Sequence, residues 1–158
     1  METRSLVWWL PPIAAVLLFV TDRLSKVFFL AHPTDQYTLL PGWLWLRFHL
    51  NTQMALSLPL FPIIYYIAVS LVLVLLCAKS VKVWQQRRLA EFTCICLIVS
   101  GAVSNLLDRL YYGGVVDFIA VKLGSVFNIA DTMIVLSVLG WIVILWQYDR
   151  AQAIQTHR

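Results

Sequence analysis

Four long apolar runs, separated by more polar segments, dominate the pattern along the chain. The runs cover residues 5–21, 61–78, 92–107 and 132–148, and the first continues through residues 22–30. Each is close to the roughly 20 residues that a helix needs to cross about 30 Å of hydrocarbon. The pattern predicts an all-α membrane protein with four transmembrane helices. We expect one integral membrane domain over 1–158, with spans at about 5–30, 61–78, 92–110 and 131–148.

The segment between the first two runs has a different pattern. In "QYTLLPGWLWLRFHL", residues 36–50, polar and apolar positions partly alternate, and β-branched and aromatic residues flank a Pro-Gly turn. Such a pattern is typical of strands joined by a turn. It predicts a small β-rich extracytoplasmic segment on the outer membrane face, with Trp43 and Trp45 at headgroup level. The later outer segment, 111–130, is expected to be a connection in which Gly124 supplies a turn.

The positions of lysine and arginine predict the orientation. Lys79, Lys82, Arg87 and Arg88 lie between the second and third runs, and further arginines lie near both termini. Positive residues concentrate on the cytoplasmic side of membrane proteins. We therefore expect a multi-pass protein with both termini and a loop over 79–91 in the cytoplasm. Segments 31–60 and 111–130 are expected to be extracytoplasmic.

Composition agrees with a membrane protein and excludes several other classes. Of 158 residues, 61% are hydrophobic and only 13% are charged, so a soluble domain of this length is excluded. The net charge of +4 comes from residues between the apolar runs, which argues against nucleic-acid binding. The three cysteines form no C-x-x-C motif, and the three histidines lack metal-ligand spacing. No metal and no cofactor are expected.

Polar residues gather near the outer ends of the predicted spans. Asp22 and Lys26 are four residues apart on one helical face, and Asn105, Asp108 and Arg109 share a face of the third span. Ionisable groups at membrane depth are costly and usually pair inside a bundle. We expect Asp22 to pair with Lys26, and Asp108 with Arg109 or a neighbour, as support for a site.

Asp117 and Asp131 lie at the same level, but no basic residue is an evident partner for either of them. In one interpretation Asp131 is the N-cap of the last helix and Asp117 is an exposed turn residue. In the other, the two carboxyl groups approach each other and share a proton. The ionised group would then deprotonate a water while the protonated one donates to a substrate carbonyl, which is peptide hydrolysis without metal. The residues alone leave both interpretations open.

Five blocks in order carry a resemblance to a known family. They are "TDRLSK", "NTQMALSLP", "GAVSNLLDR", "VVDF" and "FNIAD", and they extend from Asp22 to Asp131. Together they resemble lipoprotein signal peptidase, also called signal peptidase II. The resemblance implies that Asp117 and Asp131 are the catalytic pair of an aspartic endopeptidase. It further implies that eight residues shape or line the site: Asp22, Lys26, Asn51, Asn105, Asp108, Arg109, Asn128 and Ala130.

The same resemblance implies a substrate, a location and an inhibitor. The substrate is a prolipoprotein whose cysteine carries diacylglycerol, and cleavage falls just before that cysteine. The location is the bacterial cytoplasmic (inner) membrane, with the active site near the outer leaflet and in contact with membrane lipid. Globomycin-type cyclic peptides are expected inhibitors, and a monomer is expected.

Three positions depart from the family pattern. Gln53 and Ser104 stand where glycines are usual, and Leu56 replaces an aromatic residue. A larger side chain there would narrow the approach for substrate or inhibitor. A catalytically silent homologue that binds lipoprotein signal sequences therefore remains an alternative. A small proton-coupled transporter is a second alternative, because intramembrane Asp and Arg also mark ion pathways.

Overall fold

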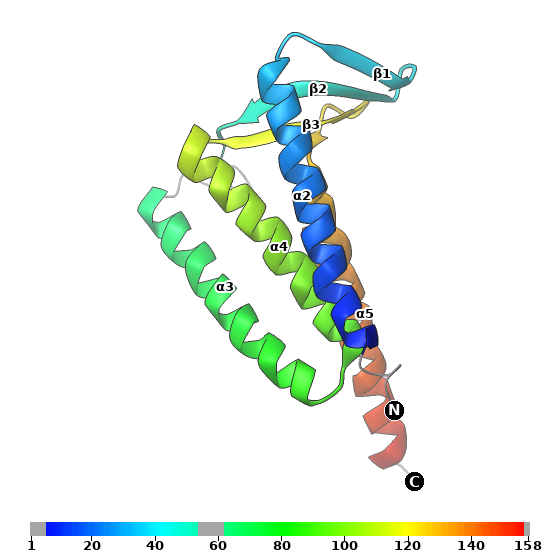
Figure 1. The fold of residues 1–158 in the computed structure, drawn as a ribbon. Helices are drawn as coiled ribbons and strands as arrows, with labels where there is room; N and C mark the ends of the chain where they lie inside the picture. Colours follow the sequence, from blue (N-terminus) through cyan, green and yellow to red (C-terminus); the bar gives the residue numbers. More distant parts are fainter. Residues whose placement is uncertain (1–5, 54–61, 157–158) are drawn as a thin grey trace.

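A small sheet covers one end of a helical bundle in the computed structural model, which describes residues 6–53 and 62–156 (Figure 1). Leu56 lies outside these residues. A short 3-10 turn, η1 (Val7–Trp9), leads into the first of four long helices. The helices are α2 (Leu10–Ala31), α3 (Pro62–Gln85), α4 (Leu89–Tyr112) and α5 (Ile129–Thr156). Helix α4 is central, because α2, α3 and α5 all pack against it.

The sheet contains four antiparallel strands in the order β1-β2-β3-β4. They are β1 (Gln36–Leu40), β2 (Leu44–Asn51), β3 (Val115–Val121) and β4 (Val126–Phe127). The predicted hairpin over residues 36–50 is confirmed as β1 and β2, and Gly42 in its turn has φ +74°. Such a left-handed conformation suits glycine because it has no Cβ.

The prediction that residues 111–130 form only a connection is wrong. β3 pairs with β2, and Gly124 at φ +85° turns the chain into β4. The sheet is therefore not confined to the segment between the first two apolar runs. The strand "VVDFIAV" shows no polar alternation because consecutive positions, and therefore both of its faces, are buried, with α2 and α4 among the elements that pack against it. Phe29 of α2 stacks on Phe118 of β3 with ring centroids 5.1 Å apart.

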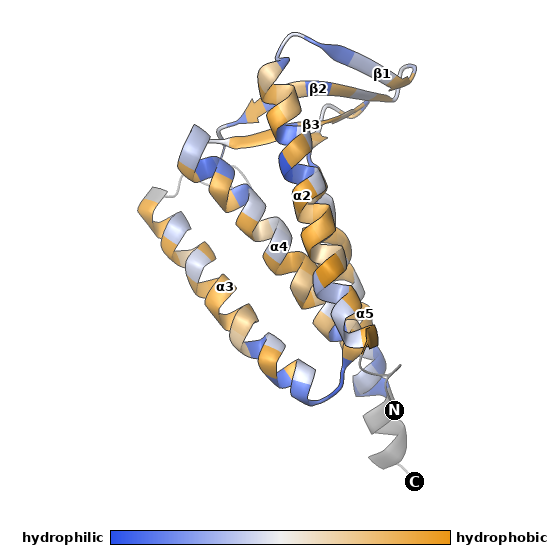
Figure 2. Ribbon diagram, in the orientation of Figure 1, coloured by the Kyte–Doolittle hydropathy of each residue, from blue (hydrophilic) through white to orange (hydrophobic). Residues whose placement is uncertain are grey.

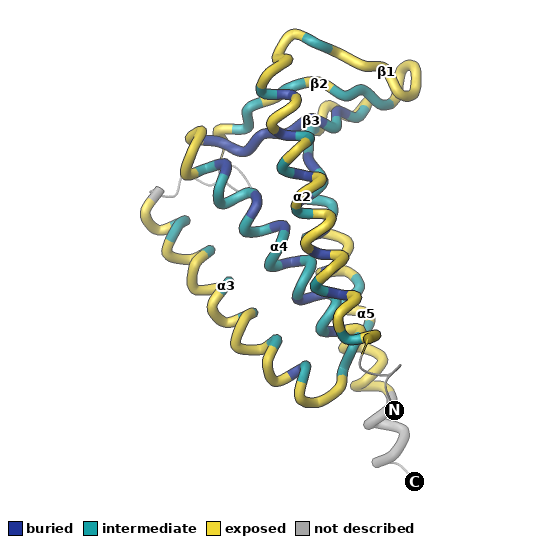
Figure 3. The backbone as a smooth tube through the Cα atoms, viewed as in Figure 1, coloured by how far each residue is buried: buried dark blue, intermediate teal, exposed yellow. Residues whose placement is uncertain are grey.

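Within residues 6–53 and 62–156, three helices are long and apolar enough to cross a membrane: Ile63–Gln85, Leu89–Tyr112 and Ile129–Arg150. Helix α2 has comparable length, but Asp22, Arg23 and Lys26 fall within it. The count of four spans therefore stays a prediction. Helix α3 is orange along most of its length in Figure 2 and mostly exposed in Figure 3. An exposed surface of this kind, which includes Ile63, Ile67, Leu71 and Val74, suits contact with lipid.

The connection between α3 and α4 is much shorter than the predicted loop over 79–91. Helix α3 continues to Gln85 and α4 begins at Leu89, so only residues 86–88 connect them. Lys79 and Lys82 consequently lie on the last turns of α3. The prediction of a long loop is wrong because hydropathy detects where apolar residues end, whereas backbone hydrogen bonds continue beyond that point.

Candidate active site

Lys26 is the centre of a buried polar cluster between α2 and α4. Its Nζ lies 2.8 Å from Asp22 Oδ2 and 2.8 Å from Asp108 Oδ2, and all three side chains are fully buried. Lys26 also donates to Asn105 Oδ1 at 2.9 Å. The predicted pairing of Asp22 with Lys26 is confirmed. A buried ammonium with two carboxylates and an amide oxygen around it is well satisfied.

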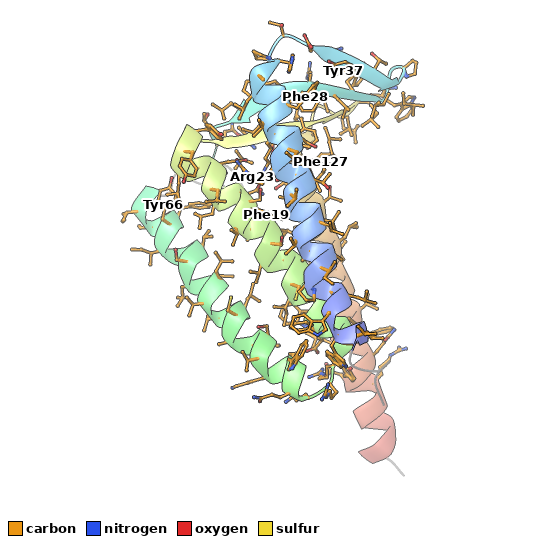
Figure 4. The ribbon with its side chains drawn as sticks, viewed as in Figure 1. Phe19, Arg23, Phe28, Tyr37, Tyr66 and Phe127 are labelled. Carbon is orange, nitrogen blue, oxygen red and sulfur yellow. The ribbon has the colours of Figure 1, made fainter. Side chains whose placement is uncertain are left out.

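Asp108 joins three elements through its two carboxylate oxygens. Oδ1 forms an ion pair with Arg23 of α2, and Oδ2 accepts the backbone N–H of Val116 at 3.2 Å as well as contacting Lys26. Arg23 points into the space between α2 and α4 in Figure 4. Asp108 therefore fixes α2 and β3 relative to α4. The cations beside it come from α2, so Arg109 is not its partner.

Asn128 connects the start of α5 to both carboxyl groups of interest. Its Oδ1 accepts the backbone N–H of Asp131 at 2.8 Å, and Asp131 Oδ2 accepts the backbone N–H of Asn128 at 3.3 Å. This reciprocal pair is a capping box, so Asn128 is the N-cap and Asp131 is the third helical residue. The interpretation of Asp131 as the N-cap is therefore wrong. Asn105 Nδ2 donates to Asp131 Oδ1 at 2.7 Å.

Asp117 lies on β3 and is only 1% exposed, so the interpretation of an exposed turn residue is also wrong. Asn128 Nδ2 donates to its Oδ1 at 2.7 Å, and Asn51 Nδ2, at the end of β2, donates to its Oδ2 at 3.1 Å. Asp117 and Asp131 thus share Asn128 as a hydrogen-bond partner. We call these two side chains the carboxyl pair.

The carboxyl pair differs from the other acids of the cluster in its lack of cationic partners among the described residues. Asp22 and Asp108 are matched by Lys26 and Arg23. Among the residues that the structure describes, neither Asp117 nor Asp131 has a lysine or arginine within ion-pair distance. Burial first, and then the nearby charge of Asp131, raise the pKa of Asp117 to about 6, although hydrogen bonds from Asn51 and Asn128 oppose the shift. Two such groups favour a state with one proton between them.

Ala130 and Gly101 bring α5 close to the cluster. The backbone N–H of Ala130 donates to Asp22 Oδ1 at 3.0 Å. A Cβ at Gly101 of α4 would lie 2.6 Å from the carbonyl oxygen of Ala130, so only glycine permits this approach. The first turn of α5, which carries Asp131, is therefore held by α2 on one side and by α4 on the other.

Arg109 lies at the rim of the site, toward α3. Its Nη2 donates to the backbone oxygen of Gln53 at 2.9 Å, and its guanidinium is 5.0 Å from the ring centroid of Tyr65. Its Nε is buried and has no hydrogen-bond partner within the described part of the chain. The Tyr66 hydroxyl donates to the Arg109 backbone oxygen at 3.3 Å. Arg109 therefore has one donor that a bound peptide carbonyl could satisfy.

A cavity of about 330 Å³ opens beside Asp131, along α5. Phe127, Thr132, Val135 and Leu136 line it together with Asp131. Val135 and Leu136 are largely exposed, so the cavity opens on an apolar helix face. An apolar surface that ends at a carboxyl group suits a ligand with a hydrocarbon part and a polar reacting centre.

All ten predicted site residues meet in this region, but the sequence analysis missed two contributors. Arg23 pairs with Asp108, and the Ser104 hydroxyl donates to Asp22 Oδ2 at 2.6 Å. Ser104 is fully buried. Helical spacing gave a signal for Ser104, which lies four residues before Asp108 and therefore on the same face of α4. The sequence contained no signal for Arg23, because no pattern in it favours Arg23 over Arg109 as the partner of Asp108.

Comparisons with known proteins place these residues in a family. A family model described as Signal peptidase (SPase) II matches residues 14–147. The chain is 38% identical to the lipoprotein signal peptidase of Caldicellulosiruptor bescii over 139 residues, covering 85% of this chain and 87% of that protein. It is 35% identical over 124 residues to the lipoprotein signal peptidase of Syntrophomonas wolfei, covering 76% and 81% of the two chains.

Solved structures agree with this result. A bacterial membrane enzyme superposes with a TM-score of 0.73 at 26% identity, covering 85% of this chain and 91% of that chain. A second one, at 23% identity, has a TM-score of 0.72, covers 87% of both chains and supports the fold alone. The extent of the family match and the identity to full-length relatives lead to one conclusion: the chain belongs to the signal peptidase II family.

Proposed function

We propose that this protein is an intramembrane aspartic endopeptidase that removes the signal peptide from diacylglyceryl-modified prolipoproteins. Cleavage falls just before the lipidated cysteine, and Asp117 and Asp131 activate the attacking water. The observation that carries the proposal is that two carboxyl groups, both hydrogen-bonded to Asn128, have no cationic partner among the described residues, whereas the other acids of the cluster are paired.

The proposed reaction uses the singly protonated carboxyl pair. The ionised carboxylate takes a proton from water, whose oxygen attacks the carbonyl carbon of the scissile amide. The protonated carboxyl donates its proton to the carbonyl oxygen, which gives a tetrahedral intermediate. Collapse breaks the C–N bond while a proton passes to the leaving nitrogen of the lipidated cysteine. The proton on the nitrogen comes from the carboxyl that took it from water, and one hydroxyl of the intermediate gives a proton back to the pair as the carbonyl forms again. The products are a signal peptide with a new carboxyl group and a lipoprotein with a free amino group, and the pair again holds one proton.

The surroundings of the pair support this chemistry. Hydrogen bonds from Asn51, Asn105 and Asn128 orient the carboxyl oxygens without neutralising them. The Nε–H of Arg109, for which the described residues provide no acceptor, is suited to a backbone carbonyl of the substrate. The apolar cavity beside Asp131 would receive hydrocarbon of the substrate while the scissile bond stays at the carboxyl level.

We further propose the orientation given by the positive residues. The α3–α4 connection, with Arg87 and Arg88, and both termini face the cytoplasm, and the sheet lies at the outer leaflet of the bacterial inner membrane. In this orientation α2 is a fourth span whose charged turn is buried against α4. The scissile bond of a substrate anchored by its acyl chains then lies at the depth of the carboxyl pair.

Replacing either member of the pair tests the proposal. In detergent with a diacylglyceryl-modified precursor, Asp117→Asn and Asp131→Asn are each expected to lower the cleavage rate by at least about a thousandfold, because each variant lacks one of the two acid–base groups. Asp149→Asn removes an exposed carboxylate from α5 and is expected to leave the rate unchanged. Cleavage at the wild-type rate by Asp117→Asn would reject the carboxyl pair as the catalytic group. Binding of the precursor without turnover by the wild type would support the silent homologue.

A further inference from the structure

A cavity at the end of α3 remote from the carboxyl pair is not used by the proposed reaction. It has a volume of about 350 Å³ and lies on one face of the last turns of α3, and residues of the connection to α4 line part of it. We call it the basic cavity. Its lining includes Leu75, Ala78, Lys79, Lys82, Val83 and Arg88.

The basic cavity carries excess positive charge. Arg88 lies 2.5 Å from Glu91, although the two groups are not aligned as a hydrogen bond. Lys79 and Lys82 have no carboxylate within ion-pair distance in the described ranges of the chain. Three cations and one acid leave a net charge of two positive units around a single cavity.

Aromatic residues of α5 position two of these cations. Lys79 Nζ lies 4.5 Å from the ring centroid of Trp141, and the Arg88 guanidinium lies 4.3 Å from that of Tyr148. Because Trp141 and Tyr148 are seven residues apart, both lie on one face of α5. The Trp141 indole N–H is buried and has no partner in the part of the structure that is described. Aromatic rings and cations at one level are typical of the headgroup region of a membrane.

One wall of the basic cavity is apolar and continues along α3. Leu75 and Ala78 lie at the cavity, and the exposed Leu71 and Val74 lie on the turn beyond them. A ligand there would meet cations at one end and an exposed apolar helix surface at the other. A free anion would use only the first of these features.

We propose that the basic cavity binds one anionic phospholipid, with its phosphodiester held by Lys79, Lys82 and Arg88 and its acyl chains along α3. Two unpaired ammonium groups complement a phosphate that carries one negative charge, and basic pockets between helices are suited to lipid headgroups. The apolar wall distinguishes the lipid from inorganic phosphate. The site is independent of the peptidase reaction, because Tyr66, which contacts the backbone of Arg109, and Lys82 lie at opposite ends of α3.

Titration followed by native mass spectrometry tests this proposal. Dioleoylphosphatidylglycerol is added to the purified full chain in detergent, and the fraction with one bound lipid is measured. Lys79→Gln with Lys82→Gln is expected to weaken binding roughly thirtyfold at low ionic strength, from about 1 kcal/mol per cation. Lys79→Arg with Lys82→Arg is expected to retain binding, because the positive charges remain.

A matched double variant provides the control. Arg47→Gln with Lys122→Gln removes two cations from the sheet end and is expected to leave binding unchanged. Dioleoylphosphatidylcholine is expected to bind equally weakly to all of these proteins. An equal loss of phosphatidylglycerol binding in the control, or displacement of that lipid by inorganic phosphate at the same concentration, would overturn the proposal. The Lys79→Gln, Lys82→Gln protein is expected to cleave precursor normally, so this test and that of the carboxyl pair can fail separately.

Discussion

Asp22 Oδ1 of α2 accepts the backbone N–H of Ala130 in the first turn of α5 at 3.0 Å, across 108 residues of sequence. The other oxygen of Asp22 receives Lys26 and Ser104. One buried carboxylate thus satisfies a free helix-end donor and also belongs to the cluster around Lys26. The position of Asp131 therefore depends on a residue from the opposite end of the chain.

Lys26→Met is expected to destabilise the protein by about 3–5 kcal/mol. The substitution leaves Asp108 buried with Arg23 as its one remaining cation among the described residues, and it leaves Asp22 buried without any cation from that set. Thermal unfolding in one detergent measures the loss. Arg47→Met removes an exposed cation from β2 and serves as the control, with an expected change below about 0.5 kcal/mol. Equal melting temperatures for the two variants would contradict the assigned role of Lys26.

Gly101→Ala is expected to lower both stability and cleavage. The new Cβ would meet the Ala130 carbonyl oxygen at 2.6 Å, and a backbone atom cannot move aside without shifting α5. We expect a loss of about 1–3 kcal/mol. Gly140→Ala is the matched control, since its Cβ would lie 3.7 Å from Cys94 Sγ, an ordinary contact. That variant is expected to be neutral or stabilised by up to about 1 kcal/mol, because alanine favours helix.

Ser104→Ala is expected to cost about 1–2 kcal/mol of stability while retaining cleavage within a few fold. The variant loses the 2.6 Å hydrogen bond to Asp22, whereas Lys26 and Ala130 still contact that carboxylate. Ser80→Ala is the control, because the Ser80 hydroxyl donates to the backbone oxygen of Cys77 in its own helix. A Ser104→Ala protein as stable as the Ser80→Ala protein would show that the hydroxyl adds nothing to the cluster.

Stability is expected to depend on pH through Asp117. The folded protein raises the pKa of this group from about 3.8 to about 6, so the folded state binds the proton more tightly than the unfolded chain. The resulting stabilisation is complete below about pH 4 and is lost as pH rises through 6. A shift of about two units corresponds to about 3 kcal/mol. Asp117→Asn cannot titrate, so between pH 4 and 7 its stability relative to wild type is expected to rise by about this amount.

The sequence predicted much of this architecture because its signals are local. The four apolar runs became helices, and the Pro-Gly turn became the β1–β2 hairpin. The i, i+4 spacing of Asp22 and Lys26 predicted their ion pair. Each of these predictions depends only on the spacing of residues within one helix or one hairpin.

The parts that the sequence did not predict depend on contacts between elements. β3 was missed because a strand packed by neighbours on both faces shows no alternation. The choice of Arg23 over Arg109 beside Asp108 depends on how α2 faces α4. Asn128, rather than Asp131, is the N-cap of the last helix, and the hydrogen bond that identifies the cap becomes visible only with the backbone.

Asn128 uses both ends of one amide: its oxygen receives the Asp131 N–H, and its nitrogen donates to Asp117. The residue at which α5 begins and the relative position of Asp117 and Asp131 are therefore coupled through Asn128. An insertion or deletion that moved the beginning of α5 by a single residue would rotate Asp131 by about 100° around the helix axis, away from its partner. The residue at which α5 begins is thus constrained by the proposed chemistry as well as by folding.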